Sequence, residues 1–193
     1  MLPAIRRRAI AASRFSILQQ GKLSDDTQQR SLHVEARLEQ LGITLPAHPK
    51  PKANYNSSCA HGDLLLISGH LPVTNEGTLL TGVVGPASGG VSVDDAYVAA
   101  RHVGLNILAT LKQEIGDLDR VEQVVKLFGI VQSHADFKQQ HLVVNGCSDL
   151  MIEVFGKPQG YHARSAIGTN TLPFDAIVEI EAMVRIKPYI DFA

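Results

Sequence analysis

The stretch from Tyr161 to Met183 constrains this 193-residue chain more than any other. It holds two apolar runs rich in β-branched residues, joined at Leu172-Pro173, which is typical of two strands with a turn between them. The first run carries one cation, Arg164, and the second alternates apolar residues with Glu179 and Glu181. Charges within apolar strands are costly unless they are paired or used. We therefore expect a hairpin of two adjacent strands that carries the functional site.

Periodicity predicts the elements that precede this stretch. Apolar residues spaced three and four apart indicate helices, and β-branched runs indicate strands. The expected elements, in chain order, are a helix from Thr27 to Leu41, a strand over 55–60, a strand over 64–67 that is buried on both faces and ends at Ser68-Gly69, a helix over 92–115, a strand over 121–131, and a helix over 136–155 that is broken at Asn145-Gly146. Ser92 and Asp95 fit a capping box at the start of the longest helix, and Gly116 fits its end.

The order β-β-α-β-α-β-β predicts an α+β fold. We expect a mixed sheet of about six strands, with the two main helices on one face and an extra helix before the domain. The other face of the sheet is then apolar and uncovered. Because large apolar faces are normally buried, we expect self-association to cover it.

Composition indicates a globular chain without a covalent framework. Hydrophobic residues make up 45% of the sequence and charged residues 19%, as in ordinary globular domains. No apolar run approaches the ~20 residues of a membrane-spanning helix, so no membrane partner is expected. The two cysteines, Cys59 and Cys147, are too few for a disulfide scaffold, and we expect both to be reduced core residues.

Residues 1–24 differ in charge from the rest of the chain. They carry five basic side chains and no acidic one, which leaves 13 basic against 19 acidic residues in the remainder. The arm has the composition of an organellar transit peptide, so we expect a mitochondrial protein if the arm acts as one and a cytoplasmic protein otherwise. Residues 25–53 are assigned to a helix and a proline-rich linker, and residues 54–188 to the domain. The acidic body argues against a nucleic-acid partner, because neutralised phosphates supply much of the affinity for nucleic acids.

Motifs for bound metals and cofactors are missing from the sequence. The eight histidines form no HxH or HExxH spacing, and the glycines form no GxGxxG or GxxxxGK[ST] loop. We therefore predict no metal site and no cofactor. No nucleophile elbow marks a catalytic serine.

Four motifs are shared with a known family. They are Tyr55 followed by Ser68-Gly69-His70-Leu71-Pro72, VVK ending at Lys126, ADF followed by Asn145-Gly146, and ARS followed by LP and VEIEA, which contain Arg164 and Glu179. Together they resemble the YjgF/RidA family, also described as endoribonuclease L-PSP with a chorismate-mutase-like fold. The resemblance covers roughly residues 41–186 and is strongest to the larger, less characterised branch of that family.

The resemblance implies a homotrimer whose sheets face inward as a barrel, with ligand clefts between neighbouring subunits. It also implies hydrolysis of an enamine or imine derived from an amino acid, which releases ammonia and a 2-keto acid. The matching positions give Arg164 as the residue that grips the substrate carboxylate and Glu179 as the residue that serves a water. The positions that match the cleft lining are Tyr55, Ser68, Gly69, Lys126, Asn145 and Ala166.

Two positions depart from the family pattern. The cysteine found two residues after the arginine in many deaminating members is Ala166 here. The glutamate that often follows is replaced by Gly168, with Asn170 soon after. The carboxylate grip is therefore retained, while the pocket beside it is altered and the particular substrate stays open.

The candidate residues also have structural interpretations. Arg164 either binds a carboxylate through two parallel hydrogen bonds or forms an ion pair with Glu179. Glu179 activates water if burial raises its pKa, and is a poor base if it pairs with Arg164. We expect only Glu179 to share the cleft with Arg164, with Glu181 on the opposite face. Tyr55 fits a core or interface position equally well, and His162 fits an ordinary hydrogen-bonded edge histidine.

Three functions remain open at this point. The leading hypothesis is a homotrimeric RidA-like hydrolase that clears reactive enamine or imine metabolites. The alternative is a trimer that binds small carboxylates and catalyses nothing. A weaker alternative is the endoribonuclease of the family label, which the acidic body and the absence of a basic stripe with stacking aromatics disfavour.

Overall fold

The computed structural model describes residues 33–48, 53–86 and 89–188. The chain divides into two compact units, residues 1–32 and 33–193, and the described residues all belong to the second. The basic arm over 1–24 and the first part of the predicted helix from Thr27 lie outside the described residues. Among those described, no helix is long and apolar enough to cross a membrane.

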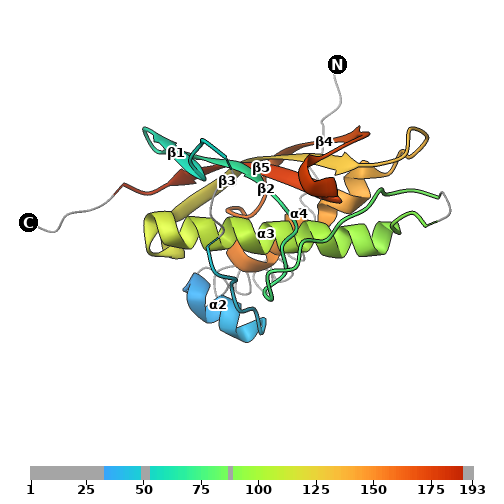
Figure 1. The fold of residues 1–193 in the computed structure, drawn as a ribbon. Coiled ribbons are helices and arrows are strands. Elements are labelled where there is room, and N and C mark those ends of the chain that lie inside the picture. The colour runs from blue at the N-terminus through green and yellow to red at the C-terminus, as the bar shows by residue number, and fades with distance from the viewer. Residues whose placement is uncertain (1–32, 49–52, 87–88, 189–193) are drawn as a thin grey trace, which may run out of the picture. The chain divides into compact units, whose positions relative to one another are not determined.

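One mixed sheet forms the upper layer of the domain in Figure 1. Its five strands are β1 (Ser58–His61), β2 (Leu64–His70), β3 (Val121–Gln132), β4 (Ala163–Thr169) and β5 (Val178–Ile186). They lie in the order β1-β2-β5-β3-β4, and only the β3–β4 pair is parallel. The chain order β-β-α-β-α-β-β is confirmed, with five strands in the described residues rather than about six.

Both long helices pack under the same face of the sheet, as predicted (Figure 1). Helix α3 (Val93–Ile115) begins at Ser92, whose Oγ accepts a hydrogen bond from the Asp95 amide at 3.0 Å, and ends at Gly116 with φ 74°. Helix α4 (Gln140–Phe155) packs beside it. The two helices and the sheet enclose one apolar core, to which Leu108, Leu127 and Leu150 each contribute a side chain with no exposed surface.

The predicted break in α4 is wrong. The helix runs without interruption through Asn145 and Gly146. A Cβ atom on Gly146 would lie 1.9 Å from the carbonyl oxygen of Tyr97 on α3. Gly146 therefore lets the two helix backbones approach closely, and the Asn-Gly pair does not mark a turn.

The predicted hairpin is also wrong. Strands β4 and β5 are not neighbours, because β3 lies between them and pairs with β4 in parallel and with β5 antiparallel. The connection that contains Leu172-Pro173 crosses over the end of β3. It includes the short helix η2 (Pro173–Asp175), which a buried glutamine holds through hydrogen bonds from Gln132 to Asp175 and from the Leu172 amide to Gln132. Arg164 and Glu179 thus belong to strands that are separated by a third.

Strand β2 differs from its prediction in length and burial. It continues through Ser68-Gly69 to His70, and Leu66 is 38% exposed, so the strand is not buried on both faces. Leu66 faces away from the helices because only one side of the sheet is covered. The register of β2 against β5 shifts between Ile67 and His70, so that two residues of β2, Ser68 and Gly69, lie opposite the single residue Glu181 of β5. This extra residue is a β-bulge.

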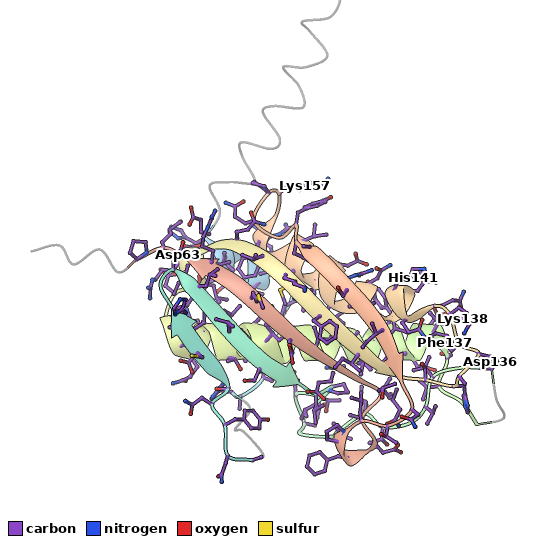
Figure 2. The ribbon with its side chains drawn as sticks, turned by 90° about the horizontal axis from the view of Figure 1, so that it is seen from above. Asp63, Asp136, Phe137, Lys138, His141 and Lys157 are labelled. Carbon is purple, nitrogen blue, oxygen red and sulfur yellow. The ribbon has the colours of Figure 1, made fainter. Side chains whose placement is uncertain are left out.

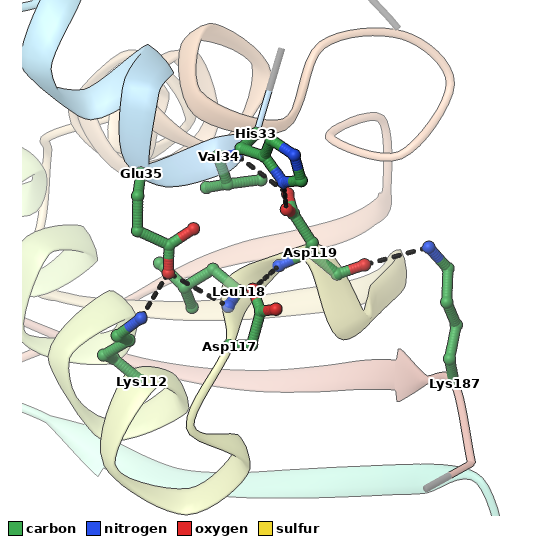
Figure 3. Close-up of polar contacts among 8 residues, drawn as sticks. All are labelled: His33, Val34, Glu35, Lys112, Asp117, Leu118, Asp119 and Lys187. Carbon is green, nitrogen blue, oxygen red and sulfur yellow. Dashed lines mark hydrogen bonds and ion pairs between the residues drawn. The ribbon is translucent and has the colours of Figure 1, made fainter. Parts of the chain in front are cut away.

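Only the second part of the helix predicted from Thr27 to Leu41 falls on described residues. This part is α2 (Val34–Gln40), which packs its buried Leu38 into the core. It contributes none of the predicted site residues. Polar contacts fix its start to η1 (Leu118–Arg120), the short 3₁₀ helix after α3 (Figure 3). The Val34 amide and the His33 imidazole both bind the Asp119 carboxylate, and Lys112 binds Glu35.

We expect this anchoring of α2 to weaken as pH rises. Asp119 raises the pKa of the His33 imidazole above 6.5 by accepting its hydrogen bond and attracting its positive charge. The stabilising contribution is therefore complete below the ordinary pKa and is lost as pH rises through the raised one. Amide exchange over α2, compared at about pH 6 and about pH 8 with intrinsic rates removed, should show less protection at the higher pH. Asp119→Asn should abolish that difference; an unchanged difference would contradict the assignment.

Candidate functional site

Arg164 lies on β4 and points toward the helices. Its Nη1 donates to Asn145 Oδ1 at 2.8 Å and to Ser148 Oγ at 2.9 Å, and its Nη2 donates to the His141 carbonyl oxygen at 3.1 Å. All three acceptors are neutral and belong to α4. Among the described residues no carboxylate forms an ion pair with this guanidinium. The alternative interpretation, an ion pair with Glu179, is therefore not found in the described part of one chain, and the charge of Arg164 is available to a ligand.

Neutral partners hold the guanidinium and leave part of its hydrogen-bonding capacity unused. Arginine has five N–H donors in a planar fork, and Arg164 uses three of them. Ser148 is also within 3.0 Å of His162 Nε2, while His162 Nδ1 lies 2.7 Å from the Gly160 carbonyl oxygen. Burial lowers the pKa of His162. His162 is thus a hydrogen-bonded support for Ser148, which agrees with the edge-histidine interpretation.

Glu179 lies on β5 and its carboxylate rests against β2. A Cβ atom on Gly69 would be 1.8 Å from Glu179 Oε1, so the carboxylate occupies the space that a side chain at 69 would fill. Ser68, the other bulge residue, donates from Oγ to the Asn56 carbonyl oxygen at 2.7 Å. Tyr55, next to Asn56 in the chain, is 48% exposed at the same end of β2. Gly69 thus lies against Glu179 and Ser68 lies beside it in the bulge, while Tyr55 is adjacent in sequence to the residue that Ser68 binds.

The environment of Glu179 raises its pKa. Half-burial is the largest cause, and the nearby carboxylate of Glu181 adds to it. A carboxylate that acts as a general base near neutral pH needs a pKa shifted upward in this way. It is opposite to the shift that an ion pair with Arg164 would cause.

The expected placement of Glu181 is wrong. Residues two apart on a strand point to the same face, and Glu179 and Glu181 both alternate with the buried Val178, Ile180 and Ala182. Both glutamates therefore lie on the sheet face that the helices leave open. Arg164 pairs with the core residue Leu127 and points to the helix side. One chain therefore holds two half-sites on opposite faces of its sheet: Arg164 with Asn145, and Glu179 with Ser68 and Gly69.

Lys126 belongs to neither half-site. It lines a shallow hollow of about 280 Å³ on the open face, with Leu66, Phe128 and Glu181. Figure 2 looks down on this face, with the helices beneath it. On this face the apolar side chains of Leu66, Ile167 and Met183, each in the middle of a strand, are 38%, 46% and 39% exposed.

The two altered positions lie beyond Arg164 on the same side of β4. Ala166 packs partly against the core. A Cβ atom on Gly168 would be 2.8 Å from both Gln140 Nε2 and Ser133 Oγ. These two residues were missed from the sequence, although a glycine in a strand is a known sign of close approach by other atoms. In Figure 2 the start of α4 lies at this end of the sheet, near the labelled Lys138 and His141.

The two cysteines and one cluster of carboxylates are the remaining candidate nucleophiles and ligands in the described residues. Cys147 is fully buried, and burial raises the pKa of its thiol to about 12, so it cannot act as a thiolate near neutral pH. Cys59 is exposed on β1, against the expectation of a core position. The carboxylates of Glu35, Asp117 and Asp119 come within 4.8 Å of one another. All three accept hydrogen bonds within the anchor of α2 (Figure 3).

A family model described as "YjgF/chorismate mutase-like, putative endoribonuclease" matches residues 35–184. The chain belongs to this family. The protein TCP17 of Trypanosoma cruzi is 42% identical over 154 residues, which covers 80% of this chain and 94% of TCP17. The crystal structure of Atu1372, a protein of unknown function from Agrobacterium tumefaciens, is 42% identical with a TM-score of 0.72, and the match covers 85% of this chain and 99% of that one.

A more distant likeness supports the fold. The crystal structure of RidA from an Antarctic Psychrobacter is 24% identical with a TM-score of 0.51, over 72% of this chain and 94% of that one. The family model, which matches residues 35–184, confirms the family resemblance that the four motifs indicated. The mixed α+β fold with one five-stranded sheet is that of YjgF/chorismate-mutase-like proteins.

Proposed function

We propose that the protein is a RidA-like hydrolase that deaminates reactive enamine or imine intermediates of amino-acid metabolism. The observation that carries the proposal is Arg164, whose guanidinium is held by three neutral acceptors and retains charge and free donors for a carboxylate. Every 2-imino acid derived from an amino acid has such a carboxylate beside its reactive carbon. Arg164 therefore binds the one group that all these substrates share.

The reaction needs a nucleophilic water at the imine carbon. Glu179, with its raised pKa, takes a proton from that water as the oxygen bonds to the carbon. The C=N π electrons move to nitrogen, which receives this proton and becomes the amino group of a carbinolamine. The hydroxyl oxygen then forms the C=O bond as its own proton passes to nitrogen, and the C–N bond breaks to release ammonia. The products are ammonia and a 2-keto acid, with one water consumed and no redox change. An enamine first takes a proton on carbon to give the same imine.

A second copy of the chain is part of the proposal. Arg164 and Glu179 face opposite sides of one sheet, so a ligand that touches both must lie between two copies. The open sheet face, with exposed Leu66, Ile167 and Met183, supplies an apolar surface for that contact. The assembly that we propose is a homotrimer with its sheets facing inward, as the family resemblance implies. Its oligomeric state is measured by light scattering at several concentrations.

The function is tested by ammonia release from 2-imino acids generated in place by an amino-acid oxidase. We expect wild-type protein to accelerate the appearance of 2-keto acid beyond the spontaneous rate, and Glu179→Gln to lose most of this acceleration. Removing a positioned general base costs roughly 10²–10⁴-fold. A wild-type rate equal to the spontaneous rate across small, branched and acidic imino acids rejects the proposal.

We expect Glu181→Gln to shift the acidic limb of the pH–rate profile to lower pH. Activity requires ionised Glu179, so it falls as pH drops through the raised pKa of that carboxyl. Because the charge of Glu181 helps to raise this pKa, its removal lets Glu179 stay ionised at lower pH. The measurement is kcat/KM against pH for the two proteins. Glu122→Gln, which removes an exposed β3 carboxylate paired with Arg185, serves as control; equal shifts in both variants would refute the prediction.

A second candidate function is binding of small carboxylates without turnover. It is favoured by Gly168, where the carboxylate of many deaminating relatives is replaced by the close approach of Gln140 and Ser133. Thermal-shift screening distinguishes the two functions. If the protein only binds carboxylates, they should stabilise the wild type but not Arg164→Ala, and no imino acid should be turned over.

The endoribonuclease activity named in the family description would be supported only if protein purified to homogeneity cleaves RNA. Mitochondrial localisation remains a prediction that a reporter fused to residues 1–24 tests.

A further inference from the structure

A buried chain of hydrogen bonds connects β2 to α3 beneath the sheet. His70 is 6% exposed. Its Nδ1 lies 2.7 Å from the Ser68 carbonyl oxygen, and its Nε2 lies 2.7 Å from Thr110 Oγ1. Thr110 Oγ1 is in turn 3.3 Å from His48 Nδ1, in the segment before the domain. None of these three side chains is part of the half-sites described above.

The chemistry of the groups allows one arrangement of protons. A carbonyl oxygen can only accept, so His70 Nδ1 must carry a proton. Burial lowers the pKa of His70, which keeps its imidazole neutral. The bare Nε2 therefore accepts the hydroxyl proton of Thr110, and Thr110 Oγ1 accepts the proton of His48 Nδ1. The ring of His70 is fixed on both sides, with its donor directed at the Ser68 carbonyl.

This carbonyl belongs to the β-bulge. Leu65, Ile67 and His70 are all buried on the helix side of β2, a spacing of two and then three residues, which only the extra residue of the bulge permits. Gly69 presents the surface against which Glu179 rests. The hydrogen bond from His70 thus holds the backbone of the bulge from below, while the carboxylate of Glu179 lies on it from above.

We propose that His70 is a positioning residue, which acts through the Ser68–Gly69 bulge to fix the carboxylate of Glu179 where water is activated. This inference rests on the proposed function. Thr110 and His48 keep the His70 ring in the tautomer that the bulge requires. Bulges beside active sites commonly serve to aim a side chain, and a carboxylate that is misplaced by about 1 Å loses on the order of 10²-fold in rate.

Two substitutions of His70 separate positioning from packing. In His70→Asn the amide nitrogen takes the place of Nδ1 and still reaches the Ser68 carbonyl, but nothing reaches Thr110. In His70→Gln the amide takes the place of Nε2, so the bond to Thr110 survives and the bond to Ser68 is lost. We expect kcat to fall about 10- to 100-fold in His70→Gln and less than about threefold in His70→Asn. KM should stay within about twofold in both, because Arg164 is untouched.

Stability and spectroscopy decide the outcome independently of turnover. Ile115→Ala, a core change near the end of α3, is the control for destabilisation alone and should leave kcat unchanged. By ¹⁵N NMR, His70 in the wild type should show a protonated Nδ1 and a bare Nε2. By ¹³C NMR, the titration of Glu179 should move in His70→Gln and stay in His70→Asn.

The inference is overturned by the opposite tautomer, by equal loss of kcat in the two His70 variants, or by losses that follow melting temperature alone. If wild-type protein turns over no imino acid, the proposed function fails, and the titration of Glu179 in the two variants still decides whether His70 positions it. A Glu179 titration that moves equally in both variants rejects the positioning role.

Discussion

Replacing Arg164 by alanine is expected to reduce kcat/KM for 2-imino acids at least about 100-fold. Two charge-assisted hydrogen bonds to a carboxylate are worth roughly 3 kcal/mol or more together, and each 1.36 kcal/mol is a factor of about ten. Most of the loss should appear in KM, because the carboxylate is bound alike before and during the reaction. The measurement is the initial rate of 2-keto acid formation over a range of substrate concentrations.

Three further variants make this result specific. Arg164→Lys keeps the charge but not the planar fork, and should retain only part of the binding. Asn145→Asp is nearly isosteric and pairs the guanidinium with a carboxylate, so it should compete with substrate and raise KM about tenfold or more. Arg101→Ala removes an arginine that is bound to Glu153 between α3 and α4, and should change kcat/KM less than about twofold. A loss in Arg101→Ala equal to that in Arg164→Ala would show that the effect is not the carboxylate grip.

The second large effect concerns stability. Gly146→Ala should lower the free energy of unfolding by about 2 kcal/mol, because its Cβ would lie 1.9 Å from the Tyr97 carbonyl oxygen. Overpacking costs up to about 3 kcal/mol, and the clash here is with a backbone oxygen, which cannot rotate away as a side chain can. The better helix propensity of alanine offsets about 1 kcal/mol of this destabilisation. Calorimetry at fixed protein concentration should show a melting temperature lower by roughly 4–8 °C.

Gly104→Ala provides the matched comparison for this prediction. Gly104 lies on the partner helix α3, and its Cβ would meet Leu150 Cδ2 at 2.8 Å and Cys147 Sγ at 3.3 Å. Both are side-chain atoms that can shift, so the loss should be smaller than for Gly146→Ala. If the two variants lose equal stability, close approach of the helix backbones does not explain Gly146.

Much of the candidate site could be predicted from residue type and motif. The candidacy of Arg164 as a carboxylate-binding residue and the need of Asn145 for a hydrogen-bond partner could be predicted, because both depend on the chemistry of one side chain. The two residues indeed bind one another. The structural roles of Gln140, Ser133 and His70 could not be predicted from the sequence, because each depends on atoms that are distant in sequence and brought close by folding.

The sequence by itself determined the elements of this protein, while the tertiary structure decided how they pair. Helix α3 with its Ser92 cap and strand β3 followed from periodicity and capping, which are properties of neighbouring residues. The insertion of β3 between β4 and β5, the bulge at Ser68-Gly69 and the continuity of α4 through Gly146 depend on contacts across the chain. Strand pairing is chosen by burial of the whole sheet face, to which residues far apart contribute together. For that reason Arg164 and Glu179, expected on adjacent strands, lie on opposite faces of one sheet.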